Sequence, residues 1–284
     1  MCIFADPVQE VADTKIFVAS AEGRQYTAYQ MQFEMPKLTR ADIVAGRTQI
    51  PGNAMILPVP WQAGEAKIGL VDMSKCVDFF DKLAEMLTPK TKGSRGLDLA
   101  YAASFGDYLE VHKVGNFDVS VAYSVADIDR ANPDVFRLGA DAKVTLQKYY
   151  EGPVFKYAFV ICALARDGKI HPLAYTSAAR EKLFVPTRHE HGSVTDLPSW
   201  DHAIYTTASG DPVGPTGYKT SSFKQLFRDY SAAKIAQYAD IGWRPVVAEV
   251  PELAPFVKGA ALTRYTYMGK LPNQDVRIPM VSSL

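Results

Sequence analysis

The segment Thr14–Met35, which reads TKIFVASAEGRQYTAYQMQFEM, decides the expected fold because it has the features of a β-hairpin. Thr14–Ser20 is rich in β-branched and aromatic residues, which favour strands. Ala21–Arg24 contains a glycine and predicts a turn. Gln25–Met35 alternates between two kinds of side chain with the period of two that strands show. The segment therefore predicts two antiparallel strands.

The same order of elements returns in the second half of the chain. Tyr157–Ala165 and Ile170–Ser177 predict a second hairpin around Arg-Asp-Gly-Lys. Each hairpin is followed by a proline-containing strand, Asn53–Trp61 in the first half and Lys182–His191 in the second. This repeat predicts two related α+β units, residues 1–150 and 151–284, or one compact domain built from both.

Three to five helices are expected to pack on largely antiparallel, mixed sheets, which makes the predicted class α+β. Ser74–Leu87 has an apolar stripe at helical spacing, with Asp72 or Ser74 as its cap. Ser221–Ile241 predicts a long helix with Gly242 at its end and with four side chains facing inward, those of Phe223, Leu226, Phe227 and Tyr230. Further expected elements are short helices over 124–131 and 141–150, strands over 244–250 and 260–268, an edge position or a strand end at Pro58 and Pro60, and a surface tail over 271–284.

Composition narrows the classes of function. The 284 residues contain 31 basic and 31 acidic side chains, so the net charge is zero and no general attraction to nucleic acid or to an anionic membrane is expected. The three cysteines, Cys2, Cys76 and Cys162, are far apart, which favours a reducing compartment over a disulfide framework. The first residues lack the features of a signal peptide, so we expect a cytoplasmic protein.

Three of the five histidines fall between Phe184 and Tyr205. If Leu183–His191 is one strand, His189 and His191 point to the same face, and His202 returns on the next strand. Imidazole and carboxylate ligands suit zinc, iron or manganese, and a three-ligand site leaves room for water or substrate. The stretch therefore predicts a divalent metal site at His189, His191 and His202, with further candidate ligands at Asp196, Asp201 and His171.

Other interpretations of this stretch stay open. The histidines can equally be polar or buried side chains at the rim of a sheet, with no ligand. The His-x-His pair is similar to the first motif of cupin barrels, but the glycine before that motif is missing and no second motif follows.

Cys2 is a second candidate for chemistry. Methionine before a small residue is often removed, and Cys2 would then carry a free α-amine able to activate its own thiol, as in N-terminal-nucleophile hydrolases. Ile3 stands where such enzymes usually have glycine, and retention of Met1 would exclude this mechanism. The alternative is that Cys2 is a small buried residue in a strand.

Several segments carry a resemblance: MCIF, TKIFVA, NAMILPVP, LEVHKVGNFDVSVA, FVPTRHEHG, WDHAIY and GKLPNQD. Together they resemble an uncharacterised bacterial family of unknown function. The pair NAMILPVP and VGNFDVSV is also similar to a larger secreted family of unknown function, whose members usually carry a signal peptide. The resemblance implies that residues 189–202 are a characteristic feature, and it implies no reaction.

Three hypotheses follow for function. The first is a non-catalytic structural or assembly protein, which self-associates or joins a protein assembly. The second is a metal-binding protein or metal-dependent enzyme that uses His189, His191 and His202. The third is a hydrolase with Cys2 as its nucleophile.

Overall fold

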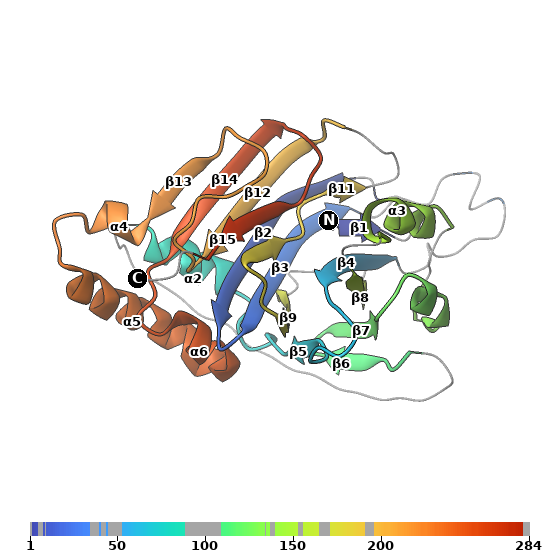
Figure 1. Ribbon diagram of the computed structural model, residues 1–284, viewed down its shortest axis with the longest axis horizontal. Helices are drawn as coiled ribbons and strands as arrows, with labels where there is room; N and C mark the ends of the chain where they lie inside the picture. Colours follow the sequence, from blue (N-terminus) through green and yellow to red (C-terminus); the bar gives the residue numbers. More distant parts are fainter. Residues whose placement is uncertain are drawn as a thin grey trace.

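The chain folds into an α+β structure with mixed, largely antiparallel sheets, as the sequence predicts (Figure 1). The computed structural model describes residues 2–4, 8, 10–34, 40, 44, 53–88, 109–133, 135–136, 140–152, 156–164, 171–190 and 196–280. Within these residues five α-helices pack on the sheets, in agreement with the predicted number.

The larger sheet has seven strands, and the predicted Thr14–Met35 hairpin lies at its centre. The hairpin strands β2 and β3 turn at Glu22 and Gly23, which have positive φ angles. In sheet order the strands are β13 (Lys219–Ser222), β14 (Thr263–Lys270), β12 (Ser199–Thr206), β2 (Glu10–Ala21), β3 (Arg24–Glu34), β9 (Leu173–Ala178) and β5 (Gly69–Val71).

The smaller sheets complete the β-structure. The six-stranded sheet runs in the order β11 (His189–Glu190), β1 (Cys2–Phe4), β4 (Ala54–Pro60), β8 (Tyr157–Ala163), β7 (Phe117–Ala122) and β6 (His112–Val114). β10 (Lys182–Val185) pairs with β15 (Val276–Pro279). The seven-stranded and the six-stranded sheet each contain strands from before and from after residue 150. The boundary between two units that the sequence predicts at residue 150 stays a prediction.

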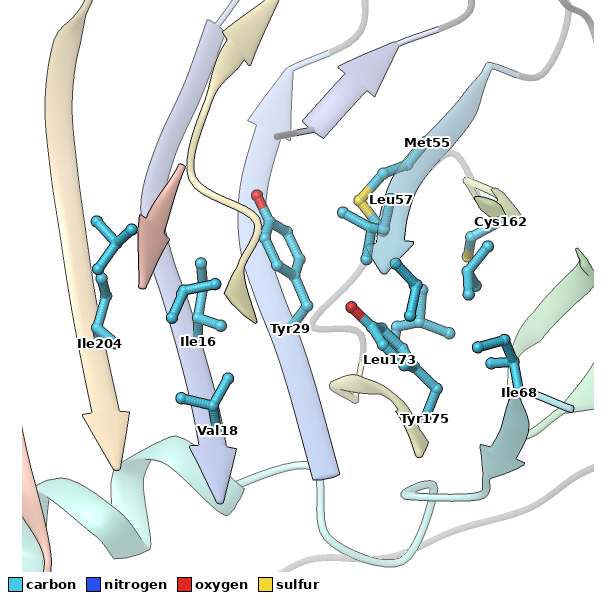
Figure 2. Packing of buried hydrophobic residues seen from close by; sticks show 14 of the residues in the cluster. Ile16, Val18, Tyr29, Met55, Leu57, Ile68, Cys162, Leu173, Tyr175 and Ile204 are labelled. Carbon is cyan, nitrogen blue, oxygen red and sulfur yellow. The ribbon is translucent and has the colours of Figure 1, made fainter. Parts of the chain in front are cut away.

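Alternate residues along the strands pack into separate layers, because successive side chains point to opposite faces. Ile16 and Val18 of β2 face the six-stranded sheet, where they join Met55 and Leu57 in the core between the sheets (Figure 2). Phe17 and its neighbours on the opposite face pack on helices α2 (Phe79–Met86), α5 (Ala232–Glu249) and α6 (Ala254–Val257). The outer face of the six-stranded sheet packs on α3 (Ala140–Tyr150) and the 3-10 helix η1 (Ala126–Arg130). The result is a four-layer arrangement of helices, sheet, sheet and helices.

The C-terminal third differs most from the sequence prediction. The expected long helix is two helices, α4 (Phe223–Leu226) and α5, and the expected strand over 244–250 is the second half of α5, followed by the 3-10 helix η2 (Pro251–Leu253). Gly242 lies inside α5 and not at its end. Because glycine has no side chain, Met86 of α2 packs directly against this position. The expected surface tail is wrong as well, because Val276 and Ile278 of β15 are fully buried.

Of two smaller predictions, one fails and one holds in part. α2 begins at Phe79, so neither Asp72 nor Ser74 caps it; the Asp72 carboxylate instead accepts the N–H of Ser74 at 2.8 Å. β4 lies inside the six-stranded sheet and not at an edge, but Pro60 is the last residue of the strand, which is the other position that the sequence allows. β1 pairs with β4 only at Met55 and Ile56, so Pro58 and Pro60 lie beyond the end of this pairing. A proline at such a position removes no hydrogen bond to β1 and is therefore tolerated.

Candidate functional site

The predicted histidine strand is broken. Lys182–Val185 forms β10 in the two-stranded sheet, whereas His189 belongs to β11 in the six-stranded sheet. The chain leaves one sheet and enters the other across Pro186–Arg188, so a single strand Leu183–His191 is wrong. The side chain of His189 and the whole of His191 lie outside the described residues, and a metal site at these histidines stays a prediction.

His202 is the member of the predicted triad whose side chain is described. It lies in β12 opposite Tyr267 of β14 and is only 3% exposed. Its ring packs on Trp200 with the two centroids 4.8 Å apart, and its Nδ1 is 3.3 Å from the Asp201 nitrogen. The geometry shows an imidazole used in the packing of the sheet.

The two aspartates proposed as further ligands have different surroundings. Asp201 is exposed, and its carboxylate accepts the N–H of Asp13 at 2.8 Å. Asp13 has a positive φ of 51° and sits at the irregularity where the register of β2 and β3 shifts. Asp201 therefore stabilises a β-bulge. Asp196 is exposed, and its carbonyl oxygen accepts the N–H of Asn273 at 2.9 Å.

His171 lies at the tight turn between β6 and β7, away from β12. The imidazole is 1% exposed; its Nε2 accepts the N–H of Asn116 at 2.9 Å, and its Nδ1 is 2.9 Å from the Pro172 carbonyl. Burial lowers the pKa of His171, so the neutral form predominates at neutral pH. Both ring nitrogens already have protein partners, and this side chain supports the turn.

Cys2 is paired with His189 in the sheet, and the sequence does not predict this pairing. It lies in β1, which pairs in parallel with β11, and its partner in the register is His189. The N-terminal strand is therefore an internal strand of the six-stranded sheet. The side chain of Cys2 lies outside the described residues, whereas Cys76 and Cys162 are buried free thiols.

A buried carboxylate beside the strand break was missed by the sequence analysis. Asp275 accepts the hydroxyl of Tyr150 at 2.6 Å and the N–H groups of Thr187 and Arg188 at 3.0 and 3.1 Å. Although burial alone raises the pKa of Asp275, the hydrogen bonds from Tyr150 and Arg188 and the positive charge of Arg188 contribute to holding it below its ordinary value. The only sequence signal is an aspartate in the GKLPNQD segment, where the sequence predicts a surface tail.

A second missed cluster joins α2 to the end of α5. The Lys82 ammonium lies 2.7 Å from Asp78 and 2.5 Å from Glu249, and 3.7 Å from the Cys76 sulfur. Burial is the largest cause that raises the pKa of Cys76 to about 12, so the thiol is protonated. Cys76, Asp78 and Glu249 offer three ligand atoms within 4.8 Å of one another, and Lys82 supplies the cation between them. Asp78 and Lys82 are four positions apart in the sequence, which suits an ion pair on a helix, but the sequence predicts a strand at Glu249.

Exposed apolar side chains lie on α4, on the turn after it and on α5. Leu226, Tyr230 and Ile241 are 41%, 49% and 45% exposed. Behind them Phe227 stacks on Tyr238 with the ring centroids 5.0 Å apart, and Tyr230 packs edge-on against Tyr238. Because Leu226 and Tyr230 were expected to face inward, their exposure corrects the sequence prediction. We call these five residues the α4–α5 patch.

Comparisons with known proteins add a distant likeness only. No family model matches the chain. The crystal structure of baculovirus P35 has 11% identity and a TM-score of 0.42, with 96% of this chain and 97% of that chain covered. A mutated baculovirus P35 after caspase cleavage has 11% identity and a TM-score of 0.45, with 95% and 100% covered. P35 from a complex with caspase-8 has 11% identity and a TM-score of 0.40, with 95% and 97% covered. At these values the likeness carries no conclusion about activity.

The described helices do not include one that is long and apolar enough to cross a membrane.

Proposed function

We propose that this chain is a non-catalytic cytoplasmic protein that acts by protein assembly, with self-association of identical copies as the first form of that assembly. The α4–α5 patch carries the proposal. Contiguous exposed apolar surface with aromatic residues is typical of sites at which proteins contact one another. Its members gather on neighbouring elements, α4, the turn after it and α5 (Figure 1).

Charge supports contact between identical copies. The net charge is zero, so no long-range repulsion opposes their approach. The residues that were candidates for catalysis also support a structural role where their side chains are described, because His171 and His202 are buried among core residues. The buried free thiols of Cys76 and Cys162 fit a reducing compartment.

Light scattering coupled to size-exclusion chromatography tests this proposal. We expect the wild-type protein to be a dimer or larger at about 100 μM, and the double variant Tyr230→Lys/Ile241→Lys to shift toward the monomer. Met268→Lys is the matched control, since Met268 is 62% exposed on β14, outside the patch. A wild-type monomer at this concentration, or equal effects of the patch and control variants, would contradict self-association.

A second candidate function is divalent metal binding by His189, His191 and His202, with Cys2 as a further ligand. The observation that favours it is the register of β1 and β11, which pairs Cys2 with His189. Thiolate and imidazole together suit zinc, and imidazole also suits iron and manganese. Elemental analysis of protein purified without a histidine tag tests it; one equivalent of metal that is lost in His189→Ala is expected, and protein free of metal would exclude it.

The same pairing keeps a Cys2 hydrolase as an alternative, with His189 beside the nucleophile in the register. Intact mass spectrometry separates the two ideas. Loss of Met1 is required for this mechanism, and retained Met1 would exclude it while leaving metal binding open.

A further inference from the structure

A cleft of about 560 Å³ lies where the two large sheets end next to each other. β5 is the last strand of the seven-stranded sheet, and β6 is the last strand of the six-stranded sheet. Figure 1 shows both strands side by side at the same end of the molecule. Residues from both strands line the cleft, among them Leu70, His112, Lys113 and Val114. The cleft is therefore bounded by two strand edges.

Within the part of the chain that the structure describes, no strand pairs with the outer edge of β6, so this edge offers backbone hydrogen-bonding groups. β6 and β7 are joined by the two-residue turn Gly115-Asn116, in which Gly115 has a φ of 58°. In such a hairpin the pair that flanks the turn, Val114 and Phe117, is hydrogen-bonded, and the next pair, Lys113 and Asp118, is not. The N–H and C=O of Lys113 therefore point away from β7, toward the open edge. An exposed strand edge of this kind is a template for pairing with another chain.

The walls of the cleft combine an apolar surface with charged rims. Ile68, Leu70, Val114 and Val121 line it together with the ring of Tyr123. The Tyr123 hydroxyl accepts the N–H of Ile68 at 3.2 Å, which fixes one wall against the other. An apolar side chain of a ligand would be well accommodated here, since ligand sites of this size are predominantly apolar with a few placed polar groups.

The charged side chains at the rim indicate the charge of the ligand. Lys113 is paired with Asp118 at 3.1 Å, and Arg130 is paired with Asp127 at 3.4 Å. The two other acidic residues of the lining also have partners: Glu110 lies 3.6 Å from His112, and the Asp72 carboxylate accepts the N–H of Ser74 at 2.8 Å. Lys67 also lines the cleft and is exposed, and within the described part of the chain it forms no ion pair. An acidic group on the ligand would give Lys67 a partner.

We propose that the β5–β6 cleft binds an extended peptide segment of a partner protein. The segment adds as a strand to the free edge of β6, places an apolar side chain against Ile68 and Leu70, and places an acidic side chain beside Lys67. β6 is three residues long, so the paired part of the peptide spans about 10 Å. Main-chain hydrogen bonds supply affinity in this mode of recognition, and the side-chain sites supply selectivity. The inference rests on the proposed function, because it assigns a partner class to a protein that acts by assembly.

Three synthetic peptides of six residues provide the test. The first alternates valine and threonine and contains one central glutamate; the second replaces this glutamate with lysine; the third is the first peptide with alternate amides N-methylated, so that it cannot pair with a strand. Binding to the wild-type chain is measured by fluorescence polarisation, and the contact surface by changes in the amide NMR signals. We expect the glutamate peptide to bind at least about tenfold more tightly than the other two and to shift the signals of residues 68–72 and 112–114.

Charge reversal at the rim gives a matched pair of variants. Lys67→Glu is expected to weaken binding of the glutamate peptide about tenfold and to favour the lysine peptide. Lys219→Glu makes the same change on β13 at the other end of the seven-stranded sheet and is expected to alter binding less than twofold. Equal binding of the N-methylated peptide, or equal effects of the two variants, would overturn the proposal.

Failure of this inference is distinguishable from failure of the proposed function. If the peptides do not bind but the α4–α5 patch variant dissociates the oligomer, the cleft proposal is wrong and assembly stands. If the glutamate peptide binds as described but the wild-type chain is a monomer, the cleft proposal stands and self-association falls. Lys113→Pro removes the outward donor of β6; if it dissociates an oligomer that the patch variant leaves intact, a second copy occupies this edge and the partner-peptide proposal is overturned.

Discussion

The N–H of Asn116 donates a 2.9 Å hydrogen bond to Nε2 of His171, which ties the β6–β7 turn to the start of β9 across 55 positions of the chain. An acceptor at Nε2 requires the proton to be on Nδ1, where it can be donated to the Pro172 carbonyl. The imidazole packs edge-on against Phe117 with the centroids 4.7 Å apart. The turn that carries the free edge of β6 is therefore held by a neutral histidine.

This relationship predicts a pH-dependent stability. An unfolded histidine has a pKa of about 6.5, and burial lowers the pKa of folded His171, with smaller opposing effects of the Pro172 carbonyl and then Asp72. Between the two pKa values the unfolded state binds more protons, so the free energy of unfolding falls as pH is lowered through this window. In His171→Gln the amide oxygen keeps the acceptor but does not titrate. Urea unfolding between about pH 7 and 5 should give a smaller loss of stability for this variant, and identical pH dependence in both proteins would disprove the assignment.

The second prediction concerns Asp275, which holds the strand break in place. Its carboxylate is 8% exposed, accepts two backbone N–H groups and the Tyr150 hydroxyl, and lies 3.9 Å from Arg188. Asp275→Asn turns a donor toward these donors and leaves Arg188 without its counter-ion, so we expect a loss of about 3 kcal/mol in the free energy of unfolding.

Tyr150→Phe is the control for this change, because it removes one hydrogen bond and keeps the carboxylate. A loss of about 1.5 kcal/mol is expected for it. Stability from Asp275 is present above the unfolded pKa of about 3.9 and is lost as pH falls through the lower folded pKa. Chemical denaturation of the wild type, Tyr150→Phe and Asp275→Asn at pH 7 checks that stability falls in this order. An Asp275→Asn variant as stable as the wild type would refute the role of Asp275.

What could be predicted from the sequence was local. The Thr14–Met35 hairpin was correct because its alternation and its turn are properties of adjacent residues. The break of the histidine strand depends on Asp275, which is 87 positions from Arg188, and no local pattern shows that contact. Residues 244–250 resemble a strand in composition but form a helix because Trp243 and Val246 are buried against the aromatic residues beneath α5. The Lys82 cluster escaped prediction for the same reason.

The third prediction uses Lys82, whose ammonium occupies the space between Cys76, Asp78 and Glu249. A positive charge between these groups stabilises the contact of α2 with α5, as a bound cation would. Lys82→Ala is expected to lose about 1 kcal/mol in stability, because the pairs are partly exposed. It is also expected to gain zinc affinity, since a thiol and two carboxylates are then free to act as ligands.

Calorimetric titration with zinc chloride checks this prediction. Binding at least about tenfold tighter than in the wild type is expected, together with a zinc-dependent rise in Tm. The double variant Lys82→Ala/Cys76→Ala is the control and should lose the gain. Wild-type and Lys82→Ala proteins with the same zinc affinity would show that the three groups do not form a site.

The last prediction concerns the connection between the sheet edge and the α4–α5 patch. The Ser222 hydroxyl accepts the N–H of Gln225 at 3.2 Å, and the Gln225 side chain accepts the N–H of Ser222 at 2.9 Å, which forms a capping box at the start of α4. α4 is only four residues long, so its own backbone bonds are few and the cap matters more than it would in a long helix. Ser222→Ala is expected to cost about 1 kcal/mol and to speed hydrogen exchange of residues 223–227. Ser221→Ala removes the neighbouring hydroxyl, which is not the cap, and should change stability by less than about 0.5 kcal/mol.

Because α4 presents Leu226 to solvent, the Ser222→Ala variant should also weaken the oligomer more than Ser221→Ala does. Equal exchange rates in the two variants would mean that packing of Phe223, and not the cap, holds α4 in place.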